Sequence, residues 1–197
     1  MLQTINKCVI NLPERTDRLE SIKGELPYLF QDPSFHLVPG VPNLNPMLGI
    51  AEAHLNCIRK AKESQWPNVL IMEDDCYFPA KEKTLAYVKN AFNHIPEDWD
   101  ILLGGLYESN GLTQVDQYWN KTKEFCGLHW YIVHERIYDR LLAYEGRFHI
   151  DRWINMSGEL NCYVTAKLFA LQRDGFSDNV KQRVSYADRL TRFQILK

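Results

Sequence analysis

The segment that most constrains the fold is the stretch of residues 68–78, Asn-Val-Leu-Ile-Met-Glu-Asp-Asp-Cys-Tyr-Phe. Its apolar part, Val69 to Met72, does not alternate between apolar and polar residues. This pattern predicts a strand that is covered on both faces, as in the sheet of an α/β protein. Three carboxylates follow the strand directly, and they repel one another at a low-dielectric edge unless positive charge lies beside them.

A ligand site explains this acidic triplet, Glu73, Asp74 and Asp75, better than folding alone does. Open α/β sheets bind ligands at the carboxyl ends of their strands. Carboxylate oxygens suit Mg²⁺ or Mn²⁺, and such a cation commonly carries a phosphorylated ligand. The alternative is a solvated acidic turn without a ligand. The position after a buried strand favours the cation site.

Length and composition indicate a single soluble domain. The chain has 197 residues, of which 45% are hydrophobic and 24% are charged, and this is ordinary for a globular protein with a substantial core. The formal net charge of −2 argues against a general binder of nucleic acid or membrane surfaces. We expect a domain over residues 1–178 and a polar, mildly basic segment of the same domain over 179–197.

The cysteines and the apolar segments of the chain indicate the cellular compartment in which the protein is expected. Five scattered cysteines without a Cys-x-x-Cys pair indicate buried free thiols rather than zinc ligands or disulfides. We see neither a signal peptide at the N-terminus nor an apolar run of about 20 residues that would span a bilayer. The expectation is a cytoplasmic protein without a transmembrane segment.

Strands and helices are expected to alternate along the chain. The expected strands are residues 7–12, 35–38, 69–72, 99–105, 128–133, 162–164 and 168–171. The expected helices are residues 15–26, 49–64, 81–94 and 134–144. Residues 41–48 and 106–122 are expected to form loops, the second a candidate active-site loop. This order predicts an α/β fold with a largely parallel sheet.

Three further groups of residues have candidate chemistry. Arg15 and Arg18 lie one helical turn apart after the first strand, where they can reach a phosphate or form surface ion pairs. His54 falls on the apolar face of a helix of small residues, where a hydrogen-bonded core histidine is the more common case. Asp151 lies among aromatic residues and His149, which suits either a general base or a helix cap.

These motifs together resemble glycosyltransferase family 25, which contains lipopolysaccharide glycosyltransferases and procollagen galactosyltransferases. Residues 9–19, Val-Ile-Asn-Leu-Pro-Glu-Arg-Thr-Asp-Arg-Leu, are similar to that family's opening, and residues 70–75 are similar to its Leu-Ile-Leu-Glu-Asp-Asp. Residues 127–142 and 149–151 carry weaker likenesses. The helix that carries His54 departs from the pattern of the family. In the family small residues and Ser precede the His, whereas Glu52 and Ala53 stand at these positions here.

The resemblance implies one GT-A-type domain that binds a nucleotide sugar, and a UDP-sugar is the first candidate. It also implies that the acidic motif binds Mn²⁺ or Mg²⁺. On this basis Asp75 and Glu73 are candidate metal ligands, Glu73 and Asp74 support the nucleotide, and Asp151 is the catalytic base of an inverting transfer. The remaining candidates for donor binding are Asn11, Leu12, Arg15 and Arg18.

Several functions stay open at this point. A metal-dependent phosphohydrolase or nucleotidyltransferase would use the same acids, and a non-catalytic domain of the same fold would use none of them. The acceptor is expected to be a hydroxyl of a glycan or lipid-linked glycan, and a modified-DNA acceptor stays open because of the basic tail. Five aromatic residues are candidate platforms for sugar rings: Tyr107, Tyr118, Trp119, Trp130 and Trp153.

Overall fold

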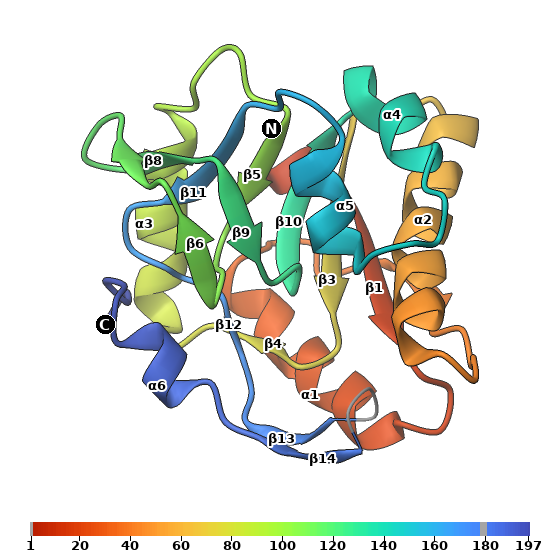
Figure 1. The fold of residues 1–197 in the computed structure, drawn as a ribbon. Helices are drawn as coiled ribbons and strands as arrows, with labels where there is room; N and C mark the ends of the chain where they lie inside the picture. Colours follow the sequence, from red (N-terminus) through yellow and green to blue (C-terminus); the bar gives the residue numbers. More distant parts are fainter. Residues whose placement is uncertain (1, 178–180) are drawn as a thin grey trace.

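A computed structural model describes residues 2–177 and 181–197 and shows a central sheet between layers of helices (Figure 1). The eight-stranded sheet has the order β2-β1-β3-β10-β5-β11-β8-β7. Its strands are β1 (Asn6–Asn11), β2 (His36–Pro39), β3 (Asn68–Glu73), β5 (Ile101–Leu103), β7 (Thr113–Gln114), β8 (Trp119–Thr122), β10 (Trp130–His134) and β11 (Cys162–Thr165). The predicted boundary between residues 178 and 179 lies outside the described residues.

The remaining elements surround this sheet. The smaller strands are β4 (Cys76–Tyr77), β6 (Glu108–Asn110), β9 (Glu124–Cys126), β12 (Leu171–Gln172), β13 (Gly175–Ser177) and β14 (Gln182–Val184). The α-helices are α1 (Thr16–Glu25), α2 (Pro46–Glu63), α3 (Glu82–Phe92), α4 (Tyr138–Leu142), α5 (Ile150–Met156) and α6 (Ala187–Leu190). Short 3₁₀ helices cover Leu2–Thr4, Leu26–Tyr28 and Glu135–Ile137.

The predicted fold class is confirmed: the structure is α/β, with a mainly parallel sheet flanked by helices. Six of the eight sheet strands share one direction, and β10 and β8 run against them. A parallel neighbour needs a crossover connection. The described chain between β5 and β10 contains no helix to supply one, so β10 enters the sheet antiparallel to both β3 and β5.

Strand β3 is buried on both faces, as its apolar sequence predicted. Val69 and Ile71 belong to the core on one side of the sheet, and Leu70 and Met72 belong to the core on the other. Helices α2, α4 and α5 supply the first core, whereas α1 and α3 supply the second (Figure 1). The polar residues after β3 therefore stand at an edge between two packed layers.

The loop expected over residues 41–48 ends earlier than predicted, because α2 begins at Pro46. The Asn45 side chain accepts a hydrogen bond from the backbone N–H of Met47, and Pro46 occupies the first helical turn. An Asn cap followed by Pro is a typical helix start. The sequence analysis missed this signal because apolar spacing begins only later in the helix.

The prediction of an irregular segment over residues 106–122 was wrong. This segment forms β6, β7 and β8, and β8 pairs with β11 in the main sheet. Trp119 is fully buried and donates a hydrogen bond from Nε1 to the carbonyl of Ala91, so it is a core residue. Trp130 is also fully buried, and neither tryptophan is a platform for sugars.

Two helical predictions need correction. The helix expected over residues 134–144 is a 3₁₀ turn followed by the short α4. Helix α5 was not predicted at all, and it places Asp151 in its first turn rather than in a loop. Its seven residues are too short to show clear helical periodicity in the sequence.

The C-terminal segment packs on the sheet domain. The backbone N–H of Leu196 donates to the carbonyl of Leu168, and Leu196 is 7% exposed. Upstream of it, β13 and β14 form a hairpin below the end of the sheet where β1 and β3 terminate (Figure 1). None of the helices in the described ranges is both long and apolar enough to cross a membrane.

Candidate functional site

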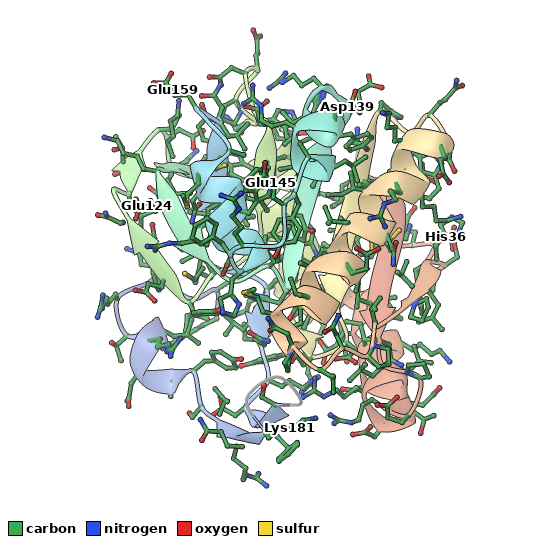
Figure 2. The ribbon with its side chains drawn as sticks, turned by 45° about the vertical axis from the view of Figure 1, so that its right-hand side comes forward. His36, Glu124, Asp139, Glu145, Glu159 and Lys181 are labelled. Atoms are coloured by element: carbon green, nitrogen blue, oxygen red, sulfur yellow. The ribbon has the colours of Figure 1, made fainter. Side chains whose placement is uncertain are left out.

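A cavity of about 570 Å³ opens at the carboxyl ends of β1, β2 and β3. All of the predicted site residues except Arg15 line it: Asn11, Leu12, Arg18, Glu73, Asp74, Asp75 and Asp151. Its other walls come from the loop before α2, the start of α5, β12 and the β13–β14 hairpin. Figure 2 labels Lys181, a cavity residue of this hairpin, at the opposite end of the molecule from Asp139 and Glu159.

Arg18 supplies positive charge to the acidic turn. Its Nη1 donates to Asp74 Oδ1 at 3.0 Å and to Asp75 Oδ2 at 3.2 Å. Its Nη2 donates to the backbone carbonyl of Phe176 in β13 at 2.7 Å. The guanidinium therefore joins α1, the end of β3 and the hairpin, and it offsets the repulsion between the carboxylates.

His54 is both a buried core residue and a part of the cavity wall. It is 1% exposed, its Nδ1 lies 2.9 Å from the Tyr131 hydroxyl, and its Nε2 lies 3.2 Å from Glu73 Oε1. A carboxylate only accepts hydrogen bonds, so Nε2–H donates to Glu73, and Nδ1 and the Tyr131 hydroxyl share the second hydrogen bond. The imidazole thus fixes the orientation of the Glu73 side chain.

Gln172 completes the network from β12. Its Nε2 donates to Glu73 Oε2 at 3.3 Å and to Asp75 Oδ2 at 3.1 Å. Strand β12 pairs with β4, and the N–H of Arg173 donates to the carbonyl of Asp75. The sequence analysis missed Gln172, because an amide in a short late strand lies about a hundred residues from the acids that it contacts.

The three carboxyl groups have different pKa values. Burial and the charge of Glu73 raise the pKa of Asp75 to about 7. Burial raises the pKa of Asp74 to about 6, although Arg18 works in the opposite direction. Burial also acts to raise the pKa of Glu73, but the hydrogen bond and charge of His54 prevail and hold it below its usual value. Of the three carboxyl groups, that of Glu73 therefore stays ionised most readily.

Asp151 lies across the cavity from α1, in the first turn of α5. Its Oδ1 accepts from the N–H of Arg152 at 2.8 Å, and its Oδ2 lies 3.4 Å from the N–H of Gly127. These backbone donors orient the carboxylate, and among the described residues no cation forms an ion pair with it. The residue that caps α5 is His149, so Asp151 does not cap this helix, and its role as the base stays a prediction.

Asn11 closes the cavity at the end of β1. Its Nδ2 donates to the Leu12 carbonyl at 2.7 Å, and its Oδ1 is buried without a hydrogen-bond partner. Arg15 differs from the other predicted residues. Its Nε and Nη2 donate to the two oxygens of Asp17 at 2.9 Å each, and the described residues that line the cavity do not include it.

Two tyrosines form an aromatic wall near Asp151. The rings of Tyr107 and Tyr186 lie 5.3 Å apart between centroids, and both residues line the cavity. The guanidinium of Arg189 lies 5.3 Å from the Tyr107 ring. The sequence analysis named Tyr107 but missed Tyr186, because nothing in the polar tail indicated that this tyrosine folds back over the cavity.

The residues of the acidic turn fit a cation that arrives with phosphate. Within the described ranges, no three His, Cys, Asp or Glu side chains are grouped to hold a metal ion. Magnesium, however, is often held by one or two carboxylates together with substrate phosphates and water. Asp75 Oδ1 is buried without a hydrogen-bond partner, whereas both Glu73 oxygens already accept from His54 and Gln172. Asp75 is therefore the better candidate ligand.

Several solved structures are similar to this chain at low sequence identity. The chain is similar to A197 from STIV, with a TM-score of 0.51 and 11% identity over 98% of this chain and 97% of that one. It also matches a mannose-1-phosphate geranyltransferase from Thermus thermophilus, with a TM-score of 0.46, 12% identity and coverage of 83% and 73%. A third match is a glycosyltransferase involved in the glycosylation of the major capsid of PBCV-1, with a TM-score of 0.42, 13% identity and coverage of 68% and 62%.

These likenesses concern the fold. No protein-family model and no curated protein sequence matches the chain. The fold is that of A197 over nearly the full length of both chains. Membership of glycosyltransferase family 25 stays a prediction from the motifs.

Proposed function

We propose that this protein transfers a sugar from a nucleoside diphosphate donor to a hydroxyl acceptor. One observation carries the proposal: residues from three separate parts of the sequence, chosen for donor binding and catalysis, line a single cavity. The cavity lies at the carboxyl ends of the strands, where α/β folds bind nucleotides. The two stronger motifs of the family resemblance, residues 9–19 and 70–75, both contribute residues to this cavity.

The acids and the arginine form the proposed phosphate side of the cavity. Departure of the sugar leaves negative charge on the diphosphate, and fixed positive charge lowers the energy of that state. Arg18 has donors in the cavity that can bind phosphate oxygens. Asp75, with Glu73 beside it, would hold Mn²⁺ or Mg²⁺, which when bound stabilises the charge of the leaving group.

Asp151 is the proposed base. It lies in the α5 wall of the cavity, and backbone N–H groups of Gly127 and Arg152 orient its carboxylate. A carboxylate there takes the proton of the acceptor hydroxyl as the oxygen attacks the anomeric carbon. Attack on the side opposite to the leaving diphosphate inverts the anomeric configuration. The acceptor is proposed to be a glycan or lipid-linked glycan hydroxyl, and Tyr107 and Tyr186 offer it an aromatic wall.

A donor screen tests this function. Thermal unfolding is followed with UDP-, GDP-, ADP- and dTDP-sugars, each with and without Mn²⁺. A donor at 100 times its Kd should stabilise the protein by about 2.7 kcal/mol. The donor that binds is then incubated with candidate acceptors, and its products are separated. Release of the intact nucleoside diphosphate supports sugar transfer, whereas release of the sugar 1-phosphate with the nucleotidyl group attached to the acceptor identifies a nucleotidyltransferase and overturns the proposal.

A further inference from the structure

The guanidinium of Arg18 occupies the side of the acidic turn that faces the cavity, and it holds one oxygen from each of two neighbouring carboxylates. Asp74 and Asp75 are 7% and 8% exposed, so their charges have little access to water. A carboxylate pair so deeply buried needs a positive partner. Arg18 is that partner in the structure.

We propose that Arg18 is an internal substitute for the divalent cation, and that the two exchange places when the donor binds. In the empty cavity Arg18 neutralises Asp74 and Asp75. When the cation takes the acids, Arg18 moves to the negatively charged phosphates that accompany it. The inference rests on the proposed function, because it requires a cation at Asp75 and an anionic donor.

The contacts of Arg18 make such an exchange feasible. Its side chain is 20% exposed and reaches Asp74 and Asp75 from α1, whereas Gln172 of β12 donates to Asp75 alone of these two. Arg18 Nη1 donates to one oxygen of each acid at 3.0 and 3.2 Å, and both distances are longer than the about 2.7–2.9 Å that is usual for hydrogen bonds between charged groups. Its third contact is a backbone carbonyl of β13, which a phosphate oxygen can replace as acceptor.

Asp75 shows why the exchange favours the cation. Arg18 and Gln172 both donate to its Oδ2, while its Oδ1 is buried and has no hydrogen-bond partner among the described residues. An unsatisfied buried oxygen carries a desolvation cost. A divalent cation brings more charge than a guanidinium and can use both oxygens, so it removes a cost that Arg18 leaves in place.

The exchange predicts opposite effects of one substitution on two ligands. In Arg18→Gln the cation has no competitor for the acids, so the protein without donor should bind Mn²⁺ alone about tenfold more tightly, which corresponds to about 1.4 kcal/mol. The same variant should bind the nucleoside diphosphate, measured without metal, at least about tenfold more weakly. A residue that merely shaped the site would shift both affinities in the same direction.

The affinity for Mn²⁺ is measured by a titration in which electron paramagnetic resonance gives the concentration of free Mn²⁺. The affinity for the nucleoside diphosphate is measured by calorimetry. Lys23→Gln is the matched control, because it removes one positive charge from the same helix and its side chain pairs with Glu20 instead of the cavity acids. Arg18→Lys keeps the charge but lacks the second terminal nitrogen, which donates to the carbonyl of Phe176. It should bind Mn²⁺ with an affinity between those of the wild type and Arg18→Gln.

The outcomes separate this inference from the proposed metal site. Asp75→Asn is measured alongside, and circular dichroism checks that each variant is folded. If Asp75→Asn abolishes Mn²⁺ binding but Arg18→Gln binds Mn²⁺ no better than the wild type, the exchange is refuted and the metal site stands. If Mn²⁺ binds none of these proteins, or binds Asp75→Asn unchanged, the metal site is refuted and the exchange with it.

Discussion

Nε2 of His54 lies 3.2 Å from Oε1 of Glu73, so a histidine of α2 holds the first carboxylate of the acidic turn from inside the core. The other ring nitrogen faces the Tyr131 hydroxyl of β10 at 2.9 Å. Three elements therefore meet at one buried imidazole. A residue that looks like ordinary core in the sequence links the packing of the helix to the geometry of the cavity.

The first prediction concerns this link. His54→Ala leaves Glu73 and the Tyr131 hydroxyl without their common partner, and it opens a small cavity. We expect it to lower the free energy of unfolding by about 2–4 kcal/mol. Tyr131→Phe removes only the hydrogen bond between the Tyr131 hydroxyl and Nδ1 of His54. It should lower the free energy of unfolding by about 1–2 kcal/mol. Urea unfolding of both variants measures the difference, and equal losses would show that the contact with Glu73 contributes nothing.

The second prediction concerns pH. The pKa of Asp75 is raised from 3.8 to about 7 in the folded protein. Between these values the folded state keeps a proton that the unfolded chain has released, so the free energy of unfolding should fall as the pH rises from about 4 to 7. Asp75→Asn copies the neutral form. At pH 8 it should be more stable than the wild type by roughly 1–3 kcal/mol, since each pKa unit is worth about 1.4 kcal/mol.

Thermal or urea unfolding from pH 4 to 8, without metal, measures this slope. Asp139→Asn serves as the control, because it changes the net charge equally and its side chain is 80% exposed. The control should keep the slope of the wild type. A slope that survives in Asp75→Asn would show that Asp75 does not cause it. Asp74, with a pKa raised to about 6, would then be the next group to replace.

Many residues of the cavity could be predicted from the sequence, because the end of an apolar strand can be recognised in the sequence. Val69 to Met72 reads as a doubly buried strand, and the acids that follow it must then stand at the sheet edge. Arg18 follows from the helix start after the first strand, where it can reach a phosphate, and Asn11 follows from the family resemblance. The sequence also indicated the α/β class, because apolar strands and amphipathic helices alternate over the first hundred residues.

The rest depends on contacts between distant residues, which no local pattern records. Gln172 and Tyr186 reach the cavity only because the chain after β11 folds back over it. The short strands over residues 108–126 gain their stability from pairing with each other and with β11, so polar residues form strands there. The charge that offsets the acidic turn was expected to be a cation alone, and Arg18 supplies part of it.

The third prediction tests how closely α2 approaches the cavity wall. A Cβ at Gly49 would lie 2.2 Å from the backbone carbonyl oxygen of Val41, and this residue lines the cavity. A backbone atom cannot swing aside as a side chain can. Gly49→Ala should therefore lower the free energy of unfolding by about 1–3 kcal/mol. It should also weaken donor binding, because the displaced segment carries Val41.

Gly24→Ala is the matched control for Gly49→Ala. Gly24 lies in α1, and nothing comes within 4 Å of a Cβ built there. Alanine favours the helix over glycine by up to about 1 kcal/mol, so this variant should be slightly more stable than the wild type. Urea unfolding compares the two. Equal effects of both substitutions would mean that the contact with Val41 relaxes without cost.

The last prediction separates binding from chemistry at Asp151. Asp151→Asn keeps the size of the side chain and one acceptor oxygen for the N–H groups of Gly127 and Arg152, but its amide cannot take a proton from the acceptor. Sugar transfer should fall by about 10²–10⁴-fold, the usual contribution of a general base. The dissociation constant of the donor should stay within about twofold of the wild-type value, because Asp151 acts on the acceptor.

The assay follows transfer in single turnover with saturating donor, and calorimetry gives the donor affinity. Glu159→Gln is the control, an exposed acid at the opposite end of the molecule from the cavity (Figure 2). It should leave both quantities unchanged. If Asp151→Asn instead weakens donor binding and leaves the single-turnover rate intact, Asp151 belongs to the donor site. In that case the base must be sought among the other cavity residues, His149 first, because it precedes the same helix and lines the same wall.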